Sequence, residues 1–410
     1  MHYHQFLVSS DLGGAGLIAL QLSRYLLERR QDCCTWVPGE GPASTEARRI
    51  GVPWSVYDAF SLLSKSTMRA GIANWKLGRR LRKTGRGIAH IHSPLHYGAL
   101  RRGLRLSGLK RVVQVQIEEG EDGLRWAFKD PPELIVPCAR FLVSSIERSL
   151  PEKALGRTRI VPVCNAVDIQ RFIPGPKQEA KQRVGIPIGR PLALMLANLA
   201  PHKGQETAIR AVSLLKQRGV DVLCWMAGME RGGATAYTSR LREMIAEMGV
   251  ADRVKLLGQR SDTPDLLRAA DFLLLPSTHE GLPIAILEAQ ATRVPVLAAP
   301  TAGIPEVISD GETGFLIAAT DAEGYAHRME QLLTNPEIGR RLADAAFQRT
   351  TREYNWQSFC RRIAELYEEL QDGPAVVPFR CLTQPRVIDK QRPHLDNRAT
   401  ARDLLSSRSF

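Results

Sequence analysis

The sequence lacks the features of membrane-spanning, secreted and zinc-binding proteins. Among its 410 residues, no apolar run approaches the ~18–20 residues that a membrane-spanning helix needs. The opening stretch, MHYHQFLVSSDLGG, has neither the basic flank nor the long apolar core of a signal peptide. There is no D-x-D or C-x-x-C motif, and the cysteines are odd in number and scattered: Cys33, Cys34, Cys138, Cys164, Cys224, Cys360 and Cys381. We therefore expect a cytoplasmic protein with no disulfide framework and no metal site.

Acidic residues are missing from one long window, although the chain as a whole carries a net charge of +13. No Asp or Glu occurs from Ala59 to Ile117. Trp75, Leu77 and Leu81 are interleaved with cations there, a pattern typical of a helix lying on an anionic bilayer. A solvated basic face without a partner is the alternative. Nucleic acid is not expected, because the window lacks both the set of interleaved aromatics that forms a base-stacking platform and any known nucleic-acid-binding motif. We therefore predict that residues 65–111 bind an anionic membrane surface, which would place the protein at the inner face of the membrane. The basic residues of this window are Lys65, Arg69, Lys76, Arg79, Arg80, Arg82, Lys83, Arg86, Arg101, Arg102, Arg105, Lys110 and Arg111.

Short apolar strands and helical stretches alternate along the chain. The expected strands are FLVSS, CCTWV, IAHIH, RVVQVQ and LIVP in the first half, and PLALMLAN, DVLCWMAG, RVKLLG, DFLLLP, VPVLAA and GFLIA in the second. This alternation predicts an α/β protein with two Rossmann-like, doubly wound parallel sheets. We expect domains at 1–168 and 169–353, joined by a linker rich in proline and glycine. A helix at about 355–370 is expected to pack back on the first domain, before a basic, disordered tail at 371–410.

The first half offers two candidate ligand-binding segments. DLGGAG at 11–16 places Gly13, Gly14 and Ala15 between a strand and a helix, where backbone amides can approach a phosphate or a sugar. The alternative is that these glycines serve only to form a tight turn. His92 follows a strand in HIHSPLH, where an uncharged hydrogen-bonding role is expected, with a structural role at the strand end as the alternative. His90 shares its face and could help bind a metal, but no carboxylate at a matching spacing supports this.

The second half carries the candidate charges. In LANLAPHKG, Lys203 precedes a helix start, so its ammonium and the free amides of the helix would converge on an anion; an exposed loop lysine is the alternative. In THEGLPIAILEAQA, Glu280 follows a strand and precedes the helix amides of Ile284 and Ala285. Glu288 lies on this helix, either facing solvent or gripping a ligand. Two anion-binding helix starts flanked by carboxylates suit a nucleotide-linked sugar.

These motifs resemble those of the retaining GT-B glycosyltransferases of family 4, over about residues 5 to 370 and most closely within 251–317. The resemblance implies two domains that face each other across a cleft. Glu280 and Glu288 match the family's E-x(7)-E signature, which puts Glu280 near the anomeric centre and Glu288 on the nucleotide ribose. Lys203 matches the lysine that neutralises the diphosphate, and His92 a histidine across from the donor sugar. Further donor contacts are implied for Gly13, Gly14, Ala15, Asn165, Asn198, Gly258, Gln259, Leu282, Pro283, Ile284 and Ala285.

The sequence departs from the family pattern at three of these motifs. Asn198 stands where most members have an arginine that shares the diphosphate with the lysine, and Gln116 stands where many have a histidine. Ala166 replaces the glycine of the family's interdomain N-G-V-D. Without this arginine, either another basic side chain neutralises the diphosphate or the leaving group is less well neutralised. Gln116 bears on how the acceptor is bound and not on the class of reaction.

The resemblance implies transfer of a sugar from a nucleotide diphosphate sugar, with a UDP-sugar favoured over GDP-mannose, and no cofactor. The expected acceptor is a glycan or lipid-linked glycan, in cell-surface polysaccharide or lipopolysaccharide synthesis. The alternatives are a GT-B nucleotide-sugar epimerase and a catalytically weak, membrane-associated partner of another transferase.

Overall fold

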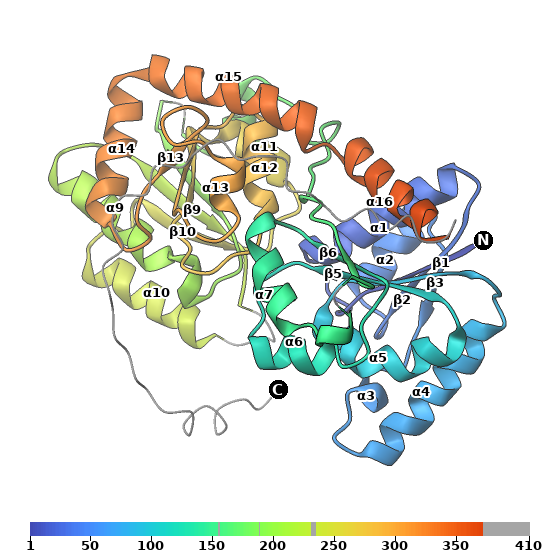
Figure 1. Cartoon of the computed structure of the whole chain (residues 1–410). Coiled ribbons are helices and arrows are strands. Elements are labelled where there is room, and N and C mark those ends of the chain that lie inside the picture. The colour runs from blue at the N-terminus through green and yellow to red at the C-terminus, as the bar shows by residue number, and fades with distance from the viewer. Residues whose placement is uncertain (155, 188, 231–234, 372–410) are drawn as a thin grey trace. The chain divides into compact units, whose positions relative to one another are not determined.

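The computed structural model describes residues 1–154, 156–187, 189–230 and 235–371, and all of these belong to one compact unit (Figure 1). The predicted tail, 371–410, lies outside the described residues except for Gln371, which ends the last helix. Within the described residues, no helix combines the length and the apolar content needed to cross a membrane.

The first sheet is parallel throughout and has seven strands in the order β3-β2-β1-β4-β5-β6-β7. The chain order reverses between β1 and β4, which makes the carboxyl ends of these two strands a topological switch point. The strands are β1 (His2–Phe6), β2 (Asp32–Val37), β3 (Trp54–Val56), β4 (Gly87–Ile91), β5 (Lys110–Val115), β6 (Leu134–Pro137) and β7 (Arg159–Ile160).

The second sheet is also parallel and has six strands in the order β10-β9-β8-β11-β12-β13. Its switch point lies between β8 and β11. The strands are β8 (Leu192–Leu196), β9 (Leu223–Ala227), β10 (Val254–Gly258), β11 (Phe272–Leu275), β12 (Val296–Ala298) and β13 (Phe315–Leu316). Central strands such as β8, β9 and β11 are apolar and largely buried, as strands covered on both faces are, and the predicted pair of doubly wound sheets is confirmed.

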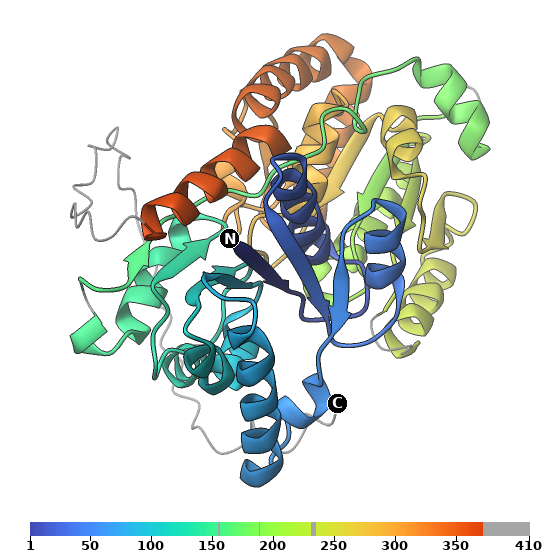
Figure 2. The same cartoon turned by 90° about the vertical axis from the view of Figure 1, so that its right-hand side faces the viewer.

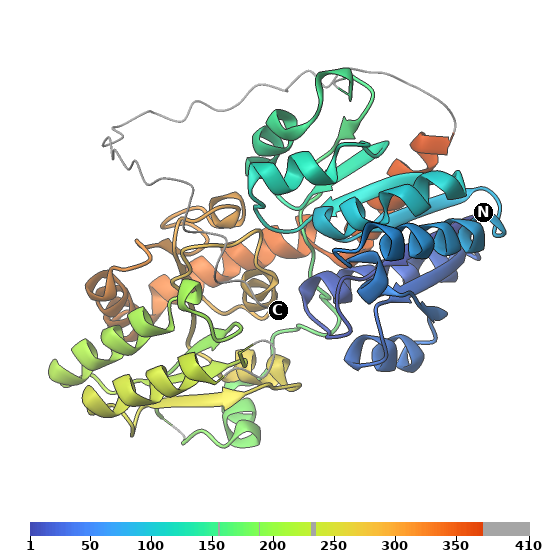
Figure 3. The same ribbon diagram turned by 90° about the horizontal axis from the view of Figure 1, so that it is seen from below.

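Helices cover both sheets, and Figure 3 shows α9 and α10 side by side on one face of the second. With the first sheet come α1 (Gly14–Glu28), α2 (Pro42–Arg49), α3 (Ala59–Leu62), α4 (Thr67–Arg82), α5 (Pro94–Ser107), α6 (Glu121–Ala127) and α7 (Val143–Ser149), with 3-10 turns η1 (Arg140–Leu142) and η2 (Glu152–Ala154). With the second come α8 (Lys177–Val184), η3 (Pro201–Lys203), α9 (Gln205–Gln217), α10 (Ala236–Glu247), α11 (Thr263–Ala269), α12 (Ile284–Ala291), α13 (Ile304–Val307), α14 (Ala322–Thr334) and α15 (Pro336–Glu353).

The last helix, α16 (Trp356–Gln371), packs on elements of the first sheet. Figure 2 shows it beside α1, and its buried residues share one hydrophobic cluster with Tyr3 of β1 and Ile18 of α1. Tyr367 is fully buried and its hydroxyl accepts a hydrogen bond from Gln5 Nε2 at 3.0 Å. The chain therefore returns to the first sheet after completing the second.

Three local predictions were wrong. FLVSS is not the first strand, because β1 ends at Phe6 and the serine hydroxyl of Ser9 then accepts from Asp11 N at 3.0 Å in a turn. The edge strand β3 was missed, since it is only three residues long and partly exposed. The Pro/Gly-rich segment is not all linker: α8 folds within it and packs on α11, with Lys181 bridging to Asp271 at 3.1 Å.

The leucines of the basic helix α4 are buried in the core and are not available to bind a membrane. Leu77 and Leu81 are buried against α5, where Gly78 lies so close to Gly103 that a Cβ would meet its carbonyl oxygen at 2.7 Å. Of the three apolar residues predicted for the membrane face, only Trp75 is exposed.

Candidate active site

A part-buried ion pair joins the two segments that carry the predicted charges. Lys203 Nζ lies 2.8 Å from Glu280 Oε1, and the Glu280 residue is only 6% exposed. Gly204 permits this approach because it has φ +75° and packs on the carbonyl of Pro276, where a Cβ would lie 2.0 Å from the oxygen. Thr278 N also donates to His202 O at 2.8 Å. The segments after β8 and β11 are thereby fixed to each other, at the switch point of the second sheet.

Three helix starts contact or form the segment 276–284. The helices α1, α9 and α12 have Gly13, Gly204 and Pro283 as N-caps, and none of these caps its helix with a side chain. The sequence placed Pro283 inside the helix, whereas it precedes it. Gly14 at the start of α1 touches the side chain of Ile284 at the start of α12, where a Cβ would lie 3.0 Å from Cδ1. Uncapped amides and helix dipoles thus converge on one region, which suits an anion.

The loop after Glu280 also contacts segments that follow strands of the first sheet. Gly281 lies against Gln116, so that a Cβ would meet the Gln116 carbonyl oxygen at 1.8 Å, and it forms a bridge with Ile117. Asn165 Nδ2 donates to Leu282 O at 2.9 Å. The described residues leave three buried polar atoms around this loop without a protein partner: Gln116 Nε2, Asn165 Oδ1 and Ser277 Oγ. Such atoms are rare in folded proteins and are those that a ligand or water would satisfy.

Glu288 is partly exposed and lines a narrow pocket. The pocket is lined from α1, the linker, α12 and α16, and it includes Gln21, Arg171 and Trp356. Burial raises the pKa of Glu288 to about 7, and the positive charge of Arg171 opposes that rise. Near neutral pH this carboxyl group can therefore gain or lose a proton in response to a neighbour.

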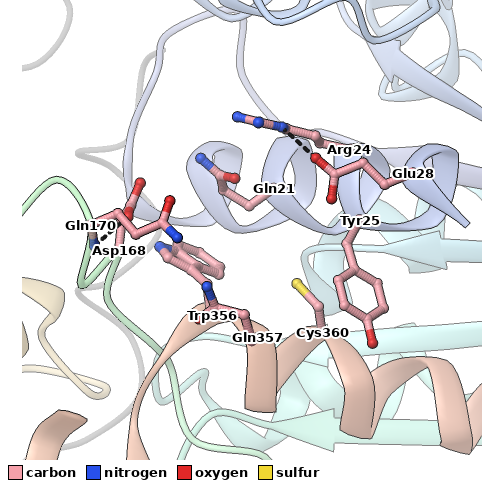
Figure 4. Close-up of a pocket in the computed structure, with 9 residues that line it drawn as sticks. All are labelled: Gln21, Arg24, Tyr25, Glu28, Asp168, Gln170, Trp356, Gln357 and Cys360. Atoms are coloured by element: carbon pink, nitrogen blue, oxygen red, sulfur yellow. Dashed lines mark hydrogen bonds and ion pairs between the residues drawn. The ribbon is translucent and has the colours of Figure 1, made fainter.

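A larger cavity of about 250 Å³ continues from this pocket, with which it shares Gln21, Asp168 and Trp356. Figure 4 shows it between α1, the linker and α16, with Tyr25 and Cys360 away from the Asp168 end. Its lining combines aromatic rings, amides and an Arg24–Glu28 ion pair of 2.9 Å. The Glu288 pocket therefore adjoins a larger cavity between α1, the linker and α16.

His92 is placed in the interior of the first domain. It is 2% exposed, stacks on His90 with ring centroids 4.3 Å apart, and has Nε2 2.9 Å from Gln5 Oε1. His90 Nδ1 lies in turn 2.6 Å from the Tyr367 hydroxyl. Burial lowers the pKa of His92 to about 4, so it is neutral as expected. Its Nε2 belongs to a network that anchors α16, whereas its Nδ1 is buried without a hydrogen-bond partner among the described residues, so the contact with a donor sugar stays a prediction.

The remaining predicted residues lie around the second sheet. Asn198 follows β8, and its carbonyl oxygen accepts from Gln205 Nε2 at 2.9 Å. Gly258 ends β10 with φ +68°, and Gln259 after it is exposed. Ala15 lies in the first turn of α1, and Ala285 in that of α12. The described residues contain no group of three or more His, Cys, Asp or Glu side chains that could hold a metal.

The sequence did not identify Arg171, Gln21 or Trp356. All three line the Glu288 pocket, but each belongs to a different segment: the linker, α1 and α16. None has a motif spacing to Glu288. The RF dipeptide after the N-A-V-D turn was the available signal for Arg171.

Comparison with known proteins agrees with this architecture. Residues 176–349 match the family described as glycosyl transferases group 1. The D-inositol 3-phosphate glycosyltransferase of Streptomyces coelicolor is 30% identical over 229 residues, which cover 51% of this chain and 50% of the relative. That of Corynebacterium urealyticum is 28% identical over 230 residues, covering 53% and 54%. The chain thus spans about half the length of the curated relatives that it matches.

Solved structures resemble nearly the whole chain at low identity. HepE from Anabaena in complex with UDP-glucose has a TM-score of 0.78 at 18% identity, covering 90% of this chain and all of that one. A glycosyltransferase from Rickettsia africae has a TM-score of 0.79 at 18% identity, covering 91% and 99%. Together with the two parallel sheets, these likenesses show the GT-B fold.

Proposed function

We propose that this GT-B protein, which belongs to the glycosyl transferases group 1 family through its second domain, transfers a sugar from a nucleotide diphosphate sugar to a carbohydrate acceptor with retention of configuration. The observation that carries the proposal is the part-buried Lys203–Glu280 pair in the segment 276–284, which three uncapped helix starts contact or form. A sugar nucleotide presents a diphosphate, which needs cations and free amides, next to a sugar carbon that becomes positive as the bond breaks.

Each charge has a proposed task. The Lys203 ammonium and the helix amides stabilise the negative charge that develops on the departing diphosphate, which is the main source of catalysis in this scheme. The Glu280 carboxylate stabilises the positive charge at the anomeric carbon. The acceptor hydroxyl attacks the face from which the nucleotide leaves, and its proton passes to a diphosphate oxygen. Glu288 accepts hydrogen bonds from the ribose hydroxyls in its pocket.

A UDP-sugar is the favoured donor. The HepE structures contain UDP, UDP with glucose, or UDP-glucose, and this chain has the same fold. The backbone of Gly258 and Gln259 lies at the carboxyl end of β10, where a base can be read without a specific side chain. GDP-mannose is the second choice.

Replacing Glu288 by Ala should weaken UDP binding by roughly 1.5–3 kcal/mol, because a hydrogen bond to a charged group is lost. Isothermal titration calorimetry at pH 8, where most of the carboxyl is ionised, measures the effect directly. Glu243→Ala on α10 is the matched control, since this glutamate is exposed and lies away from the pocket. Equal UDP affinity in wild type and the Glu288 variant would return this residue to a structural role.

The acceptor side of the first sheet is acidic. The segments between β1 and α1, β2 and α2, β4 and α5, and β5 and α6 start at the carboxyl ends of the strands, and their charged side chains are Asp11, Glu40, Glu118 and Glu119. His92 within them is neutral. A carbohydrate without charged groups near the reacting hydroxyl fits this edge better than a phosphorylated one. This supports a glycan acceptor, such as the end of a lipid-linked glycan.

Neutral acceptors should accordingly outperform their phosphorylated counterparts. Two or three carboxylates at about 8 Å in water oppose the charge of about −1.5 to −2 on an acceptor phosphate by about 1.5–3 kcal/mol together, or roughly ten- to a hundredfold in kcat/KM. Nucleotide release from UDP-glucose can be compared with myo-inositol, glucose and neutral oligosaccharides against inositol phosphate and glucose 6-phosphate. A clear preference for the phosphorylated member of each pair would contradict the prediction while leaving the glycosyltransferase proposal intact.

Residues 59–83, which we call the α3–α4 surface, support the proposal that the acceptor is held at a membrane. Five large apolar side chains there are each more than half exposed, and they differ from the leucines expected from the sequence: Phe60, Leu63, Met68, Ile72 and Trp75. Met68, Ile72 and Trp75 share one stripe of α4 with Lys76, Arg79 and Lys83 at helical spacing. Exposed apolar groups with cations beside them suit the interface of an anionic bilayer.

Reversing Lys76, Arg79 and Lys83 to Glu should release the protein from anionic vesicles. Each cation near the surface contributes about 1 kcal/mol, and the attraction should weaken with salt. Co-sedimentation with phosphatidylglycerol vesicles at low and high salt measures binding, and UDP release serves as the control for folding. Reversal of Arg210, Arg240 and Arg242 in the second domain makes the same change of charge elsewhere. Wild type that stays in the supernatant at low salt would rule out the membrane partner.

One assay distinguishes the proposed reaction from its alternatives. Purified protein is incubated with UDP-sugars and GDP-mannose, with and without neutral glycans and lipid extract, and both nucleotide and sugar products are identified. Acceptor-dependent release with a retained α linkage supports the proposal. Interconversion of the sugar, or release without an acceptor product, indicates the epimerase. No product under any condition indicates the weak partner protein.

A further inference from the structure

We propose that Arg171 is a positioning residue of the donor site: its side chain lines the same narrow pocket as Glu288, where its positive charge favours the carboxylate that accepts the ribose hydroxyls of a nucleoside diphosphate sugar. This inference rests on the proposed function and adds to it a residue outside the E-x(7)-E signature. It also explains how a carboxyl group in a narrow pocket can serve as a charged hydrogen-bond acceptor.

The linker holds Arg171 firmly in place. Asp168 begins a turn in which its Oδ1 atom accepts from Gln170 N at 3.0 Å and from Arg171 N at 3.1 Å. The next residue, Phe172, is 4% exposed and belongs to the main hydrophobic cluster. On the far side, Arg268 of α11 donates to Ile173 O at 3.0 Å and to Arg171 O at 3.5 Å. The backbone of Arg171 is therefore fixed to the second domain.

The guanidinium of Arg171 reaches toward the nucleotide-binding end of that domain. Its Nη2 donates to Ser261 O at 3.4 Å, in the loop that follows Gly258 and Gln259. Its side chain lines the same narrow pocket as Glu288. One exposed arginine thus lies between the loop proposed to contact the base and the carboxyl proposed to contact the ribose.

Few other charges compete with Arg171 for control of Glu288. From α1 the pocket receives Leu17 and Gln21, and from α16 it receives Trp356, none of which titrates near neutral pH. The linker contributes Asp168, whose carboxylate is already held by two backbone amides. Glu46 of α2 interacts with Arg171 but is bound by Arg49 through two hydrogen bonds of 2.6 and 2.7 Å. Arg171 is the pocket's cation among the described lining residues.

The protonation of Glu288 supplies a readout that a purely structural role would not move. The pKa of Glu288 is raised by burial to about 7, and the charge of Arg171 acts to lower it. The ionised form binds the ribose hydroxyls, so donor affinity should be full above this pKa and fall as the pH drops through it. Without the guanidinium the pKa should rise further, and the loss of affinity should begin at a higher pH.

The experiment is calorimetry with UDP-glucose between pH 6 and 8.5, without acceptor. UDP-glucose is chosen over UDP because both of its phosphates are diesters and bind no proton in this range. For Arg171→Gln we expect a dissociation constant several-fold above that of wild type at pH 7, which approaches wild type at pH 8.5. Arg171→Lys should keep most of the wild-type profile, because it preserves the charge. Arg240→Gln on α10 removes an equal charge elsewhere and should change nothing.

Two further variants connect the effect to Glu288. Glu288→Gln should bind weakly with a flatter pH profile, and adding Arg171→Gln to it should cause no further loss at pH 7. An Arg171→Gln profile that is parallel to wild type, with the same fold-loss at pH 6.5 and 8.5, would overturn the inference and leave Arg171 a structural role.

A measurement without ligand keeps this inference separate from the proposed function. With glutamate labelled by ¹³C at the carboxyl carbon, the NMR signal absent from Glu288→Gln reports the titration of Glu288. Its midpoint should lie at a higher pH in Arg171→Gln than in wild type, and equal midpoints would contradict the inference. If wild type binds no nucleotide sugar, the proposed function fails, while the titration still decides whether Arg171 controls Glu288.

Discussion

Replacing Glu280 by Gln should lower kcat by about 10²-fold or more while UDP remains bound at least as tightly as by wild type. The first effect follows from the proposed task of Glu280, because a preorganised charge at the reacting centre contributes on that scale. The second follows from the geometry. Glu280 Oε1 lies 2.8 Å from Lys203 Nζ, so its carboxylate partly neutralises the ammonium that the diphosphate needs.

Because kcat should fall while UDP affinity stays the same or rises, the test distinguishes a role in catalysis from a role in nucleotide binding. Removing the carboxylate leaves the Lys203 ammonium with more free charge for the diphosphate, while the sugar carbon loses its stabilising partner. Product formation is measured by nucleotide release, and affinity by calorimetry with UDP. Glu337→Gln at the exposed start of α15 is the matched control. Wild-type kcat in the Glu280 variant would remove this residue from the catalytic scheme, and a large loss of UDP affinity would show that it binds the nucleotide instead.

The parts of the fold that followed from the sequence are those with a strong local pattern. Runs such as PLALMLAN and DFLLLP are continuous and apolar because their strands are covered on both faces, and they predicted β8 and β11 to within two residues at each end. The spacing of Glu280 and Glu288 is likewise local, since one helix start, α12, separates the two side chains. The structure of such short segments can be predicted from their own residues, without knowledge of distant contacts.

The features that were missed depend on contacts between distant segments. His92 ends a strand as predicted, but its environment comes from Gln5, 87 positions away in sequence, and through His90 from Tyr367 of α16. Leu77 and Leu81 have the period of an amphipathic helix, and only the close crossing of α4 and α5 at Gly78 and Gly103 shows that their face is already occupied. A helical period identifies a buried face without identifying what buries it.

Arg171 shows the same limit at the candidate site. The pairing of this residue with Glu288 joins a linker to a helix more than a hundred residues later, and no spacing rule connects them. Likewise, the segment with α8 contains prolines and glycines typical of a linker, yet Lys181 and Asp271 hold it on the second sheet. Composition described this segment, but tertiary ion pairs decided its structure.

Replacing Lys203 by Ala should lower kcat/KM by about 10²–10³-fold, the range expected for loss of a preorganised group that stabilises developing charge. The loss should be at the upper end, because Asn198 stands where the family's second cation would be. The structure adds a second cost: without Lys203, the buried Glu280 carboxylate has lost its ion-pair partner and faces the diphosphate as a like charge.

The double variant Lys203→Ala with Glu280→Gln separates the two costs. Because it removes both charges, it should bind UDP more tightly than Lys203→Ala alone, although it should remain inactive. Thermal unfolding of all three variants checks that the single change has not simply unfolded the site, since an unpaired buried carboxylate also destabilises the protein.

Restoring the second cation provides the complementary test. Asn198→Arg places a guanidinium after β8, at the end of the strand that leads to Lys203, and should recover part of the kcat/KM lost in Lys203→Ala. Asn198→Gln is the matched control, because it lengthens the side chain without adding charge. A mild effect of Lys203→Ala, together with no recovery by the arginine, would mean that another cation neutralises the diphosphate. Recovery by arginine but not by glutamine would establish that charge at this position, rather than packing, limits departure of the nucleotide.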